Sequence, residues 1–189
     1  RNLLDLDWIG VIHLTDLPAK RQFLESIAAD LIFTAAVPCS ATEAASWAVN
    51  PTRVVGISPV IGKIVELTPA MQTAPEVLAH AESFLRDIGL EIVRVADGPG
   101  LVRMRILSCI INEAIATAAD GVASPGDIDT AMKLGANYPL GPIEWADNLT
   151  PEIVLAVMRG LQYEYGEDRY RPAPLLVRKV LAKQNFISE

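Results

Sequence analysis

The sequence predicts an α/β region followed by an all-α region, and two observations lead to this prediction. Up to about residue 97, short apolar runs alternate with stretches of helical periodicity, which is typical of a mostly parallel sheet. After residue 97 the strand pattern disappears and only helical periodicity remains. We therefore predict one domain at residues 1–97 and a second domain at residues 98–189.

The strands of the first domain are predicted from short runs of apolar and β-branched residues. The run at residues 8–14 is almost wholly apolar, as expected of a strand that is covered on both faces. Further strands are predicted at residues 31–36, 53–57, 63–67 and 90–95.

Three helices are predicted between these strands. The first covers residues 18–29, where apolar residues recur on one helix face. Ser40 with Glu43, and again Thr73 with Glu76, have the spacing of a capping box. In that motif the hydroxyl bonds the third helical amide and the Glu reaches back to the first residue. We expect a helix to begin at both places.

The second domain is predicted to consist of helices alone. A helix at residues 99–120 is apolar around most of its circumference, so several partners must bury it. Ser124 and Thr150 each precede a proline, as expected of a helix N-cap followed by proline at the first helical position. A last helix is predicted at residues 175–183.

Composition and charge exclude several classes of protein. The chain is 51% apolar and 21% charged, which argues for a globular fold. The net charge of -7 argues against a nucleic-acid partner, because phosphate binding needs clustered Lys and Arg. The apolar run at residues 106–111 is far shorter than the ~20 residues of a membrane span. Cys39 and Cys109 lack metal-ligand spacing, which favours a cytoplasmic location.

Motifs at the domain boundary and near the end of the chain resemble those of the 3-hydroxyacyl-CoA dehydrogenase family. Residues 97–105, Asp-Gly-Pro-Gly-Leu-Val-Arg-Met-Arg, resemble its helix opening D-x-P-G-F-x-x-N-R. Residues 165–172, Tyr-Gly-Glu-Asp-Arg-Tyr-Arg-Pro, resemble the tail of the bacterial 3-hydroxybutyryl-CoA branch. Residues 50–56 and 64–66 resemble the end of its cofactor domain.

Two more motifs of the second domain complete the resemblance. Residues 128–136, Ile-Asp-Thr-Ala-Met-Lys-Leu-Gly-Ala, resemble the signature I-D-x-A-M-x-x-G. Residues 139–144, Pro-Leu-Gly-Pro-Ile-Glu, resemble P-M-G-P-x-E. The similarity extends from about residue 8 to residue 186, with the motifs in the same order and at matching spacing.

The resemblance implies a fold and a reaction. The fold is a partial Rossmann-type parallel sheet that binds NAD, followed by a helical dimerisation domain, with acyl-CoA held between them. The reaction is the NAD-dependent oxidation of 3-hydroxyacyl-CoA to 3-oxoacyl-CoA, in which a His removes the hydroxyl proton as hydride leaves C3. A Glu orients that His, and a Ser and an Asn bind the substrate oxygen.

Of these four catalytic groups, only the Glu has a counterpart in the chain. Glu66 matches it and is the catalytic candidate. Ser58 stands where the His is expected, and about four residues of the family pattern are missing between it and Glu66. Val37 stands at the position of the Ser, and Met104 at the position of the Asn.

The expected NAD contacts are also incomplete. The chain contains no G-x-G-x-x-G turn, the motif that holds a dinucleotide pyrophosphate. Lys20 falls where the family has a Lys that contacts NAD, so Lys20 is the candidate cofactor-binding residue. Thr15 stands where an acidic residue is expected. Since the sequence begins with Arg1 inside what resembles the second half of a Rossmann sheet, we expect the parent gene to encode residues upstream.

Each candidate also has a structural interpretation. Glu66 is alternatively a strand carboxylate that is solvated or paired with an Arg, and Lys20 an exposed lysine on a helix surface. His13 is expected in the core of its strand. Cys39 lies near a strand end as a potential nucleophile, although no His partner is identifiable, and Cys109 is expected in the core.

Aromatic and basic residues of the second domain have two interpretations each. The aromatic residues line an acyl or CoA site, or pack between helices; they are Trp145, Tyr163, Tyr165 and Tyr170. The arginines attract CoA phosphates, or form a solvated face; they are Arg159, Arg169, Arg171 and Arg178.

Two functions from different classes follow from the sequence. The first is a 3-hydroxyacyl-CoA dehydrogenase acting on acyl-CoA with NAD. The second is a catalytically silent member that keeps the helical domain as a homodimeric scaffold or subunit. The helical motifs are intact while three catalytic groups are replaced, and this contrast favours the second function.

Overall fold

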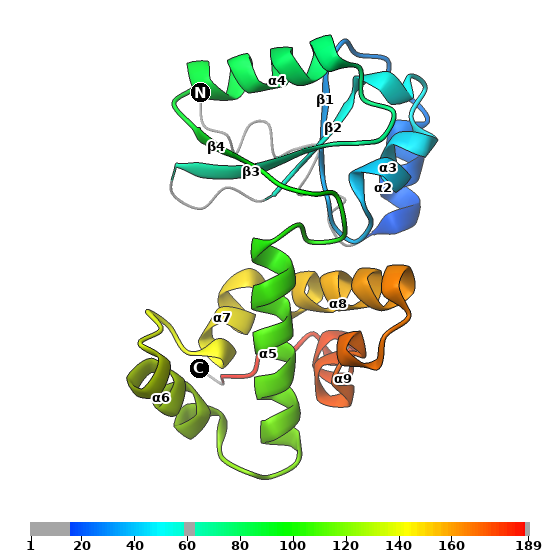
Figure 1. Cartoon of the computed structure of the whole chain (residues 1–189). Coiled ribbons are helices and arrows are strands. Elements are labelled where there is room, and N and C mark those ends of the chain that lie inside the picture. Colours follow the sequence, from blue (N-terminus) through cyan, green and yellow to red (C-terminus); the bar gives the residue numbers. More distant parts are fainter. Residues whose placement is uncertain (1–15, 59–62, 188–189) are drawn as a thin grey trace. The chain divides into compact units, whose positions relative to one another are not determined.

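The computed structural model describes residues 16–58 and 63–187, and the strand predicted at residues 8–14 lies outside this range. The chain divides into two compact units, Arg1–Arg103 and Met104–Glu189 (Figure 1). The division falls within the motif at residues 97–105. Each unit is described separately below.

The first unit contains a four-stranded sheet in the order β1 (Ile32–Ala35), β2 (Val54–Ile57), β3 (Ile64–Pro69) and β4 (Glu91–Arg94). β1 pairs with β2, and β3 with β4, in parallel, which confirms the mostly parallel sheet. β2 and β3 are antiparallel, with Gly56 opposite Thr68. The segment between them is too short for the crossover of about a dozen residues that parallel pairing requires.

Helices cover both faces of this sheet (Figure 1). α2 (Leu17–Leu24) and α3 (Ala41–Trp47) pack with β1 and β2 around Leu24, Ile32 and Val54. α4 (Pro75–Asp87) covers the other face through Val77, Ala81 and Leu85, which pack against Val55, Val65 and Leu67. The short 3-10 helix η2 (Pro51–Arg53) precedes β2.

Close packing of α3 on the sheet depends on Gly56. A Cβ atom at this position would lie 2.6 Å from the Cβ of Ala41 and 2.7 Å from the Cγ2 of Thr68. Both distances are shorter than carbon atoms tolerate, so only glycine lets the first turn of α3 approach β2 and β3 this closely.

Of the two predicted capping boxes, the one at Ser40 forms a helix cap, and the prediction of a cap at Thr73 is wrong. The hydroxyl of Ser40 accepts the N–H of Glu43 at the start of α3, as predicted. α4 instead begins after Ala74, which has no side-chain cap. Thr73 donates its hydroxyl to the carbonyl of Val54 at 2.5 Å, so it joins the entry of α4 to β2.

The second unit is all-helical, as predicted. Its helices are α5 (Arg103–Ala119), α6 (Pro125–Ala136), α7 (Pro142–Leu149), α8 (Pro151–Tyr165), η3 (Asp168–Tyr170) and α9 (Pro174–Ala182). α5 is central, and its Ile111 and Ile115 pack with Ile143, Val154 and Leu176 from three other helices. None of the described helices is both long enough and apolar enough to cross a membrane.

One helix start and one predicted cap of this region differ from the prediction. α5 begins at Arg103, later than expected, because Gly100 and Leu101 have positive φ angles and the Gly100 N–H bonds the carbonyl of Ala36. Thr150 has a φ of 70° and its side chain makes no cap bond to α8. The Ser124 cap is confirmed, since its hydroxyl accepts the N–H of Asp127.

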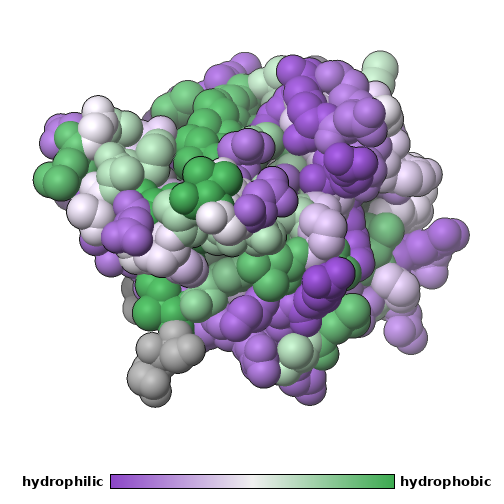
Figure 2. Space-filling view, turned by 90° about the horizontal axis from the view of Figure 1, so that it is seen from below, coloured by the Kyte–Doolittle hydropathy of each residue, from purple (hydrophilic) through white to green (hydrophobic). Residues whose placement is uncertain are grey.

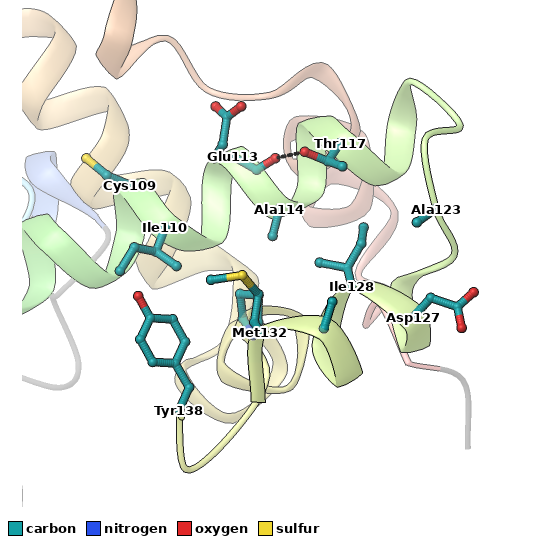
Figure 3. A pocket seen from close by; sticks show the side chains of 12 residues that line it. Cys109, Ile110, Glu113, Ala114, Thr117, Ala123, Asp127, Ile128, Met132 and Tyr138 are labelled. Atoms are coloured by element: carbon teal, nitrogen blue, oxygen red, sulfur yellow. Dashed lines mark hydrogen bonds between the residues drawn. The ribbon is translucent and has the colours of Figure 1, made fainter. Parts of the chain in front are cut away.

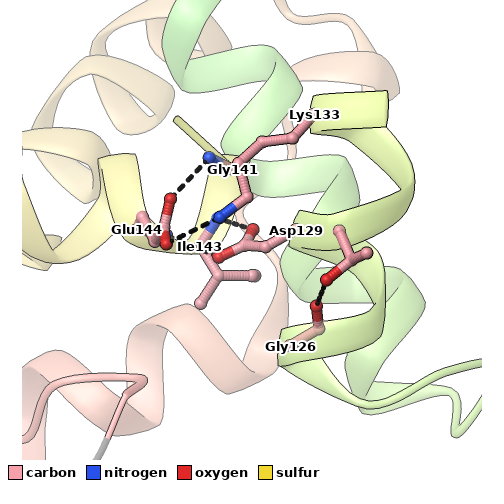
Figure 4. A network of polar contacts seen from close by, with 7 residues as sticks. Gly126, Asp129, Lys133, Gly141, Ile143 and Glu144 are labelled. Atoms are coloured by element: carbon pink, nitrogen blue, oxygen red, sulfur yellow. Dashed lines mark hydrogen bonds and ion pairs between the residues drawn. The ribbon is translucent and has the colours of Figure 1, made fainter. Parts of the chain in front are cut away.

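The signature motifs at residues 128–136 and 139–144 meet in one polar network (Figure 4). The buried Asp129 carboxylate on α6 accepts the N–H groups of Ile143 and Glu144 at 2.8 and 3.0 Å, which caps the start of α7. Any side chain at Gly141 would overlap this carboxylate. The network therefore explains why aspartate and glycine stand at these positions.

A second carboxylate secures the same helix start. Glu144 accepts the N–H of Gly141 at 2.8 Å and pairs with Lys133 of α6 at 2.9 Å (Figure 4). The Gly141 N–H and the Lys133 ammonium hold the pKa of Glu144 below its usual range. α6 and α7 are thus joined by two carboxylates, one from each helix.

Candidate functional site

Glu66 is buried on β3, with a relative exposure of 6%. Its Oε1 atom accepts the backbone N–H of Arg103 at 2.9 Å, at the first residue of α5. Its Oε2 atom is buried and has no hydrogen-bond partner among the described residues. The solvated interpretation of Glu66 is therefore wrong. The carboxylate is bonded to a main-chain amide and leaves one oxygen available.

Ser58 lies directly beside Glu66, as the sequence position of the expected His implies. The Ser58 hydroxyl accepts the Glu66 N–H at 3.0 Å, and the Ser58 N–H donates to the Glu66 carbonyl at the same distance. Ser58 is buried. A short hydroxyl that extends the β2–β3 pairing occupies this position, and it offers no imidazole to the Glu66 carboxylate.

Lys20 is buried at the carboxyl end of β1, with a relative exposure of 6%. Its ammonium donates to the carbonyls of Ala35 and Val37, the latter at 2.9 Å. Burial lowers the pKa of Lys20. The interpretation of Lys20 as an exposed surface lysine is therefore wrong, because this side chain holds the turn between β1 and α3. Its contact with NAD stays a prediction.

The positions of the missing Ser and Asn are both apolar and buried. Val37 follows β1 and has a relative exposure of 1%. Met104 lies in the first turn of α5 and has the same exposure. Neither side chain has a hydrogen-bond donor for a substrate oxygen.

Cys39 lies in the turn that Lys20 holds. Burial raises the pKa of the Cys39 thiol to about 11, and this effect exceeds the opposing influence of the Lys20 charge. A thiol with this pKa is almost wholly protonated near neutral pH and is a poor nucleophile. The nucleophile interpretation therefore has no support from its surroundings.

We expect Cys39 to react with a maleimide at least ~100-fold more slowly in the folded protein than in urea, because two pKa units alone reduce the thiolate ~100-fold. A chain with Cys109→Ser isolates this reaction, which mass spectrometry follows over time. Equal rates in the folded and unfolded protein would contradict the burial described above.

Asp97, from the motif at residues 97–105, has a structural role that the sequence reasoning missed. Its carboxylate accepts the N–H groups of Ala41 and Thr42, both at 2.8 Å, and the Thr42 hydroxyl at 2.7 Å. It also accepts the N–H of Gly98 at 2.9 Å. Asp97 therefore caps α3 from a distant part of the sequence and fixes the chain that leads to α5.

A cavity of the second unit lies between α5 and α6 and has a volume of about 610 Å³ (Figure 3). Apolar side chains such as Ile110, Ile128 and Met132 form most of its wall. Glu113 and Tyr138 also line it, and so does Cys109, which is only half-buried. The prediction that Cys109 lies in the core is therefore wrong.

Of the aromatic and basic candidates, the structure brings together Tyr165, Tyr170 and Arg169, whose guanidinium lies 4.8 Å from the Tyr170 ring centre. Tyr165 and Tyr170 surround Arg105, which donates to both hydroxyls and lies 4.5 Å from the Tyr165 ring centre. Trp145 packs on Tyr138 with ring centres 5.1 Å apart. Tyr163 is exposed.

Comparisons with known proteins agree with these features. Residues 100–185 match the family model for the 3-hydroxyacyl-CoA dehydrogenase C-terminal domain. A 3-hydroxybutyryl-CoA dehydrogenase of Clostridioides difficile is 35% identical over 97% of this chain and 68% of its own length. The 3-hydroxyadipyl-CoA dehydrogenase of Escherichia coli is 39% identical over 71% of this chain, but only 28% of its own length is matched.

A solved structure has a similar fold. The (S)-3-hydroxybutyryl-CoA dehydrogenase of Ralstonia eutropha superposes with a TM-score of 0.77 at 32% identity, covering 89% of this chain and 62% of that protein. The chain thus spans between about a quarter and two thirds of these relatives. Together with the motifs at residues 97–105 and 128–144, these matches show that the chain belongs to the 3-hydroxyacyl-CoA dehydrogenase family.

Proposed function

We propose that this chain is a 3-hydroxyacyl-CoA dehydrogenase-like protein whose turnover of acyl-CoA is strongly impaired. The observation that carries the proposal is the pair formed by Ser58 and Glu66. A serine hydroxyl lies where the family resemblance places the proton-accepting His, and it is bonded to the Glu66 main chain. A neutral hydroxyl is not a base near pH 7, whereas imidazole is suited to this task.

Glu66 is the catalytic candidate that remains, and we propose that it acts as a positioning residue. Its Oε1 atom accepts the N–H of Arg103 at the start of α5. No described residue donates a hydrogen bond to its Oε2 atom, which can therefore accept one. In a dehydrogenase this second oxygen would orient an imidazole. The loss of a general base reduces turnover by about 10²–10⁴-fold. The apolar Val37 and Met104 remove the groups that would stabilise charge on the substrate oxygen.

NAD would accept the hydride in such a reaction, and Lys20 is the residue that we propose on the cofactor side. Lys20 uses two donor positions on the carbonyls of Ala35 and Val37, so it shapes the turn after β1. The sequence contains no glycine-rich turn for the pyrophosphate. The given sequence therefore contains only part of a dinucleotide site, on the side of Lys20.

Turnover of acetoacetyl-CoA with NADH tests the proposal. We expect a rate at least ~10³-fold below that of a homologue that has the catalytic His, because the base and the oxygen-binding groups are replaced together. Loss of NADH absorbance measures the rate. A rate comparable to that of the homologue would overturn the proposal.

The variant Glu66→Gln separates residual catalysis from structure. Glutamine keeps a carbonyl oxygen that can accept the Arg103 N–H, but it removes the carboxylate charge. If a slow residual turnover is enzymatic, it falls further in this variant while the unfolding midpoint changes little.

A second candidate function is a catalytically silent homodimeric scaffold or subunit in the cytoplasm. The roles of Asp97 and Asp129 favour it, since both motif carboxylates cap helices and neither needs a substrate. The two free thiols, Cys39 and Cys109, fit a reducing compartment. Absence of turnover together with a stable homodimer would select this function over the impaired enzyme.

A further inference from the structure

Arg103 bears a buried nitrogen atom that no described contact uses. Nη1 of its guanidinium is buried, and nothing within residues 16–58 and 63–187 accepts a hydrogen bond from it. Arginine ordinarily places its charged end in water, and Figure 2 shows hydrophilic residues spread over one face of the molecule. A charged donor that is buried without an acceptor is unfavourable. The unpaired Nη1 therefore indicates a place for a further acceptor.

Glu66 has the complementary unpaired atom, Oε2, and both atoms belong to the start of α5. The Glu66 carboxylate lies at this helix start, because its Oε1 atom accepts the Arg103 N–H at 2.9 Å. Side chains of helical residues lean toward the helix N-terminus. The Arg103 side chain is the first of α5, so it leaves the helix on the side where the carboxylate lies. A buried donor and a buried acceptor are thus placed at one end of the same helix.

The opposite charges of Glu66 and Arg103 select a neutral group as the ligand. The carboxylate would repel an anion, and the guanidinium would repel a cation. A carbonyl oxygen accepts from Nη1 but donates nothing to Oε2, whereas a hydroxyl oxygen accepts one hydrogen bond and donates another. A hydroxyl group therefore satisfies both buried atoms at once.

We infer that Arg103 and Glu66 together bind the 3-hydroxyl group of a 3-hydroxyacyl-CoA, with Arg103 as the donor and Glu66 as the acceptor. The inference rests on the substrate class of the proposed function and adds a specificity, because the site binds the 3-hydroxy form in preference to the 3-oxo form. Arg103 supplies a donor that Val37, at the position of the expected Ser, does not offer. Both hydrogen bonds are made to the unreacted hydroxyl, so they contribute affinity and not rate.

The preference between the two forms is the first test. Isothermal titration calorimetry with the full chain measures the affinities for 3-hydroxybutyryl-CoA and for acetoacetyl-CoA. We expect 3-hydroxybutyryl-CoA to bind at least ~10-fold more tightly, because one hydrogen bond to a charged group distinguishes the two ligands. Equal affinities, or no binding of either ligand, would overturn this inference, whereas the impaired turnover of the proposed function is measured separately and would stand.

Substitution of Arg103 tests the donor. Arg103→Met keeps an apolar stem without the guanidinium and should weaken the binding of 3-hydroxybutyryl-CoA at least ~10-fold. Arg103→Lys keeps a charged donor and should recover part of this affinity. Arg53→Met removes the same charge from a half-buried arginine in η2, at the end of β2 away from Ser58, and should have little effect. Similar losses in Arg103→Met and Arg53→Met would overturn the role of Arg103.

Substitution of Glu66 tests the acceptor through the preference itself, which a purely structural role does not change. In Glu66→Gln the carbonyl oxygen can still accept the Arg103 N–H, but the amide nitrogen donates where Oε2 accepted. The preference for the 3-hydroxy form should therefore disappear or reverse toward acetoacetyl-CoA, while the unfolding midpoint changes little. An unchanged preference would show that Glu66 does not accept the hydroxyl, and the inference would fail.

Discussion

Replacing Asp129 by alanine is expected to lower the stability of the helical unit by about 3 kcal/mol. The substitution removes a buried carboxylate that accepts two main-chain N–H groups at the start of α7. Hydrogen bonds to charged groups contribute roughly 1.5–3 kcal/mol each, and a buried amide left without a partner adds a desolvation cost. Urea unfolding followed by far-ultraviolet circular dichroism measures the change.

Two further substitutions control this experiment. Asp129→Asn keeps one acceptor oxygen and should show about half the loss. Asp120→Ala changes an exposed aspartate just after α5 and should leave the midpoint within ~0.5 kcal/mol of the unmodified chain. If Asp129→Ala were as harmless as Asp120→Ala, the cap on α7 would not contribute to stability.

Replacing Gly56 by alanine is expected to destabilise the first unit by about 2–3 kcal/mol. The new Cβ atom would meet Ala41 of α3 and the methyl group of Thr68 at distances below 3 Å. Relief requires α3 to move away from the sheet, and overpacking of this kind costs roughly 1–3 kcal/mol or more. The unfolding midpoint, followed by the fluorescence of Trp47 on α3 in a chain with Trp8→Phe and Trp145→Phe, reports the loss.

A compensating change distinguishes steric overlap from other effects of the added methyl group. The double variant Gly56→Ala, Thr68→Ser removes one of the two clashing methyl groups and should recover part of the stability. Recovery is measured against Thr68→Ser alone. If the second substitution restored nothing, contact with the Thr68 methyl group would not be a cause of the loss.

Local patterns predicted most of the elements, because those patterns act over one or two helical turns. The apolar runs predicted as strands at residues 31–36, 53–57, 63–67 and 90–95 correspond to β1 to β4. The Ser40 and Ser124 caps are present, as their spacing indicated. The fold class followed from the alternation of these elements. The two motifs at residues 128–136 and 139–144 supported the family resemblance, but the bonds that join Asp129 and Glu144 to the start of α7 were found only in the structure.

Features that depend on distant contacts were not predicted. Thr73 has the spacing of a cap, but its hydroxyl donates a hydrogen bond to the carbonyl of Val54 on β2. Lys20 has the sequence surroundings of a surface residue, yet it is buried and its ammonium donates to the carbonyls of Ala35 and Val37 at the end of β1. The sequence near Asp97 indicates a helix opening, while its carboxylate bonds a helix more than fifty residues earlier. Such partners are brought together only by the complete fold.

The capping role of Asp97 and Asp129 has a consequence for how genomes are interpreted. A homologue can lose its proton-transfer groups and keep its fold, whereas loss of either aspartate would leave main-chain N–H groups at a helix start without their acceptor. Searches that recognise such signatures report the scaffold and not the chemistry. A count of dehydrogenase genes that is based on these signatures alone would therefore include inactive homologues together with active enzymes.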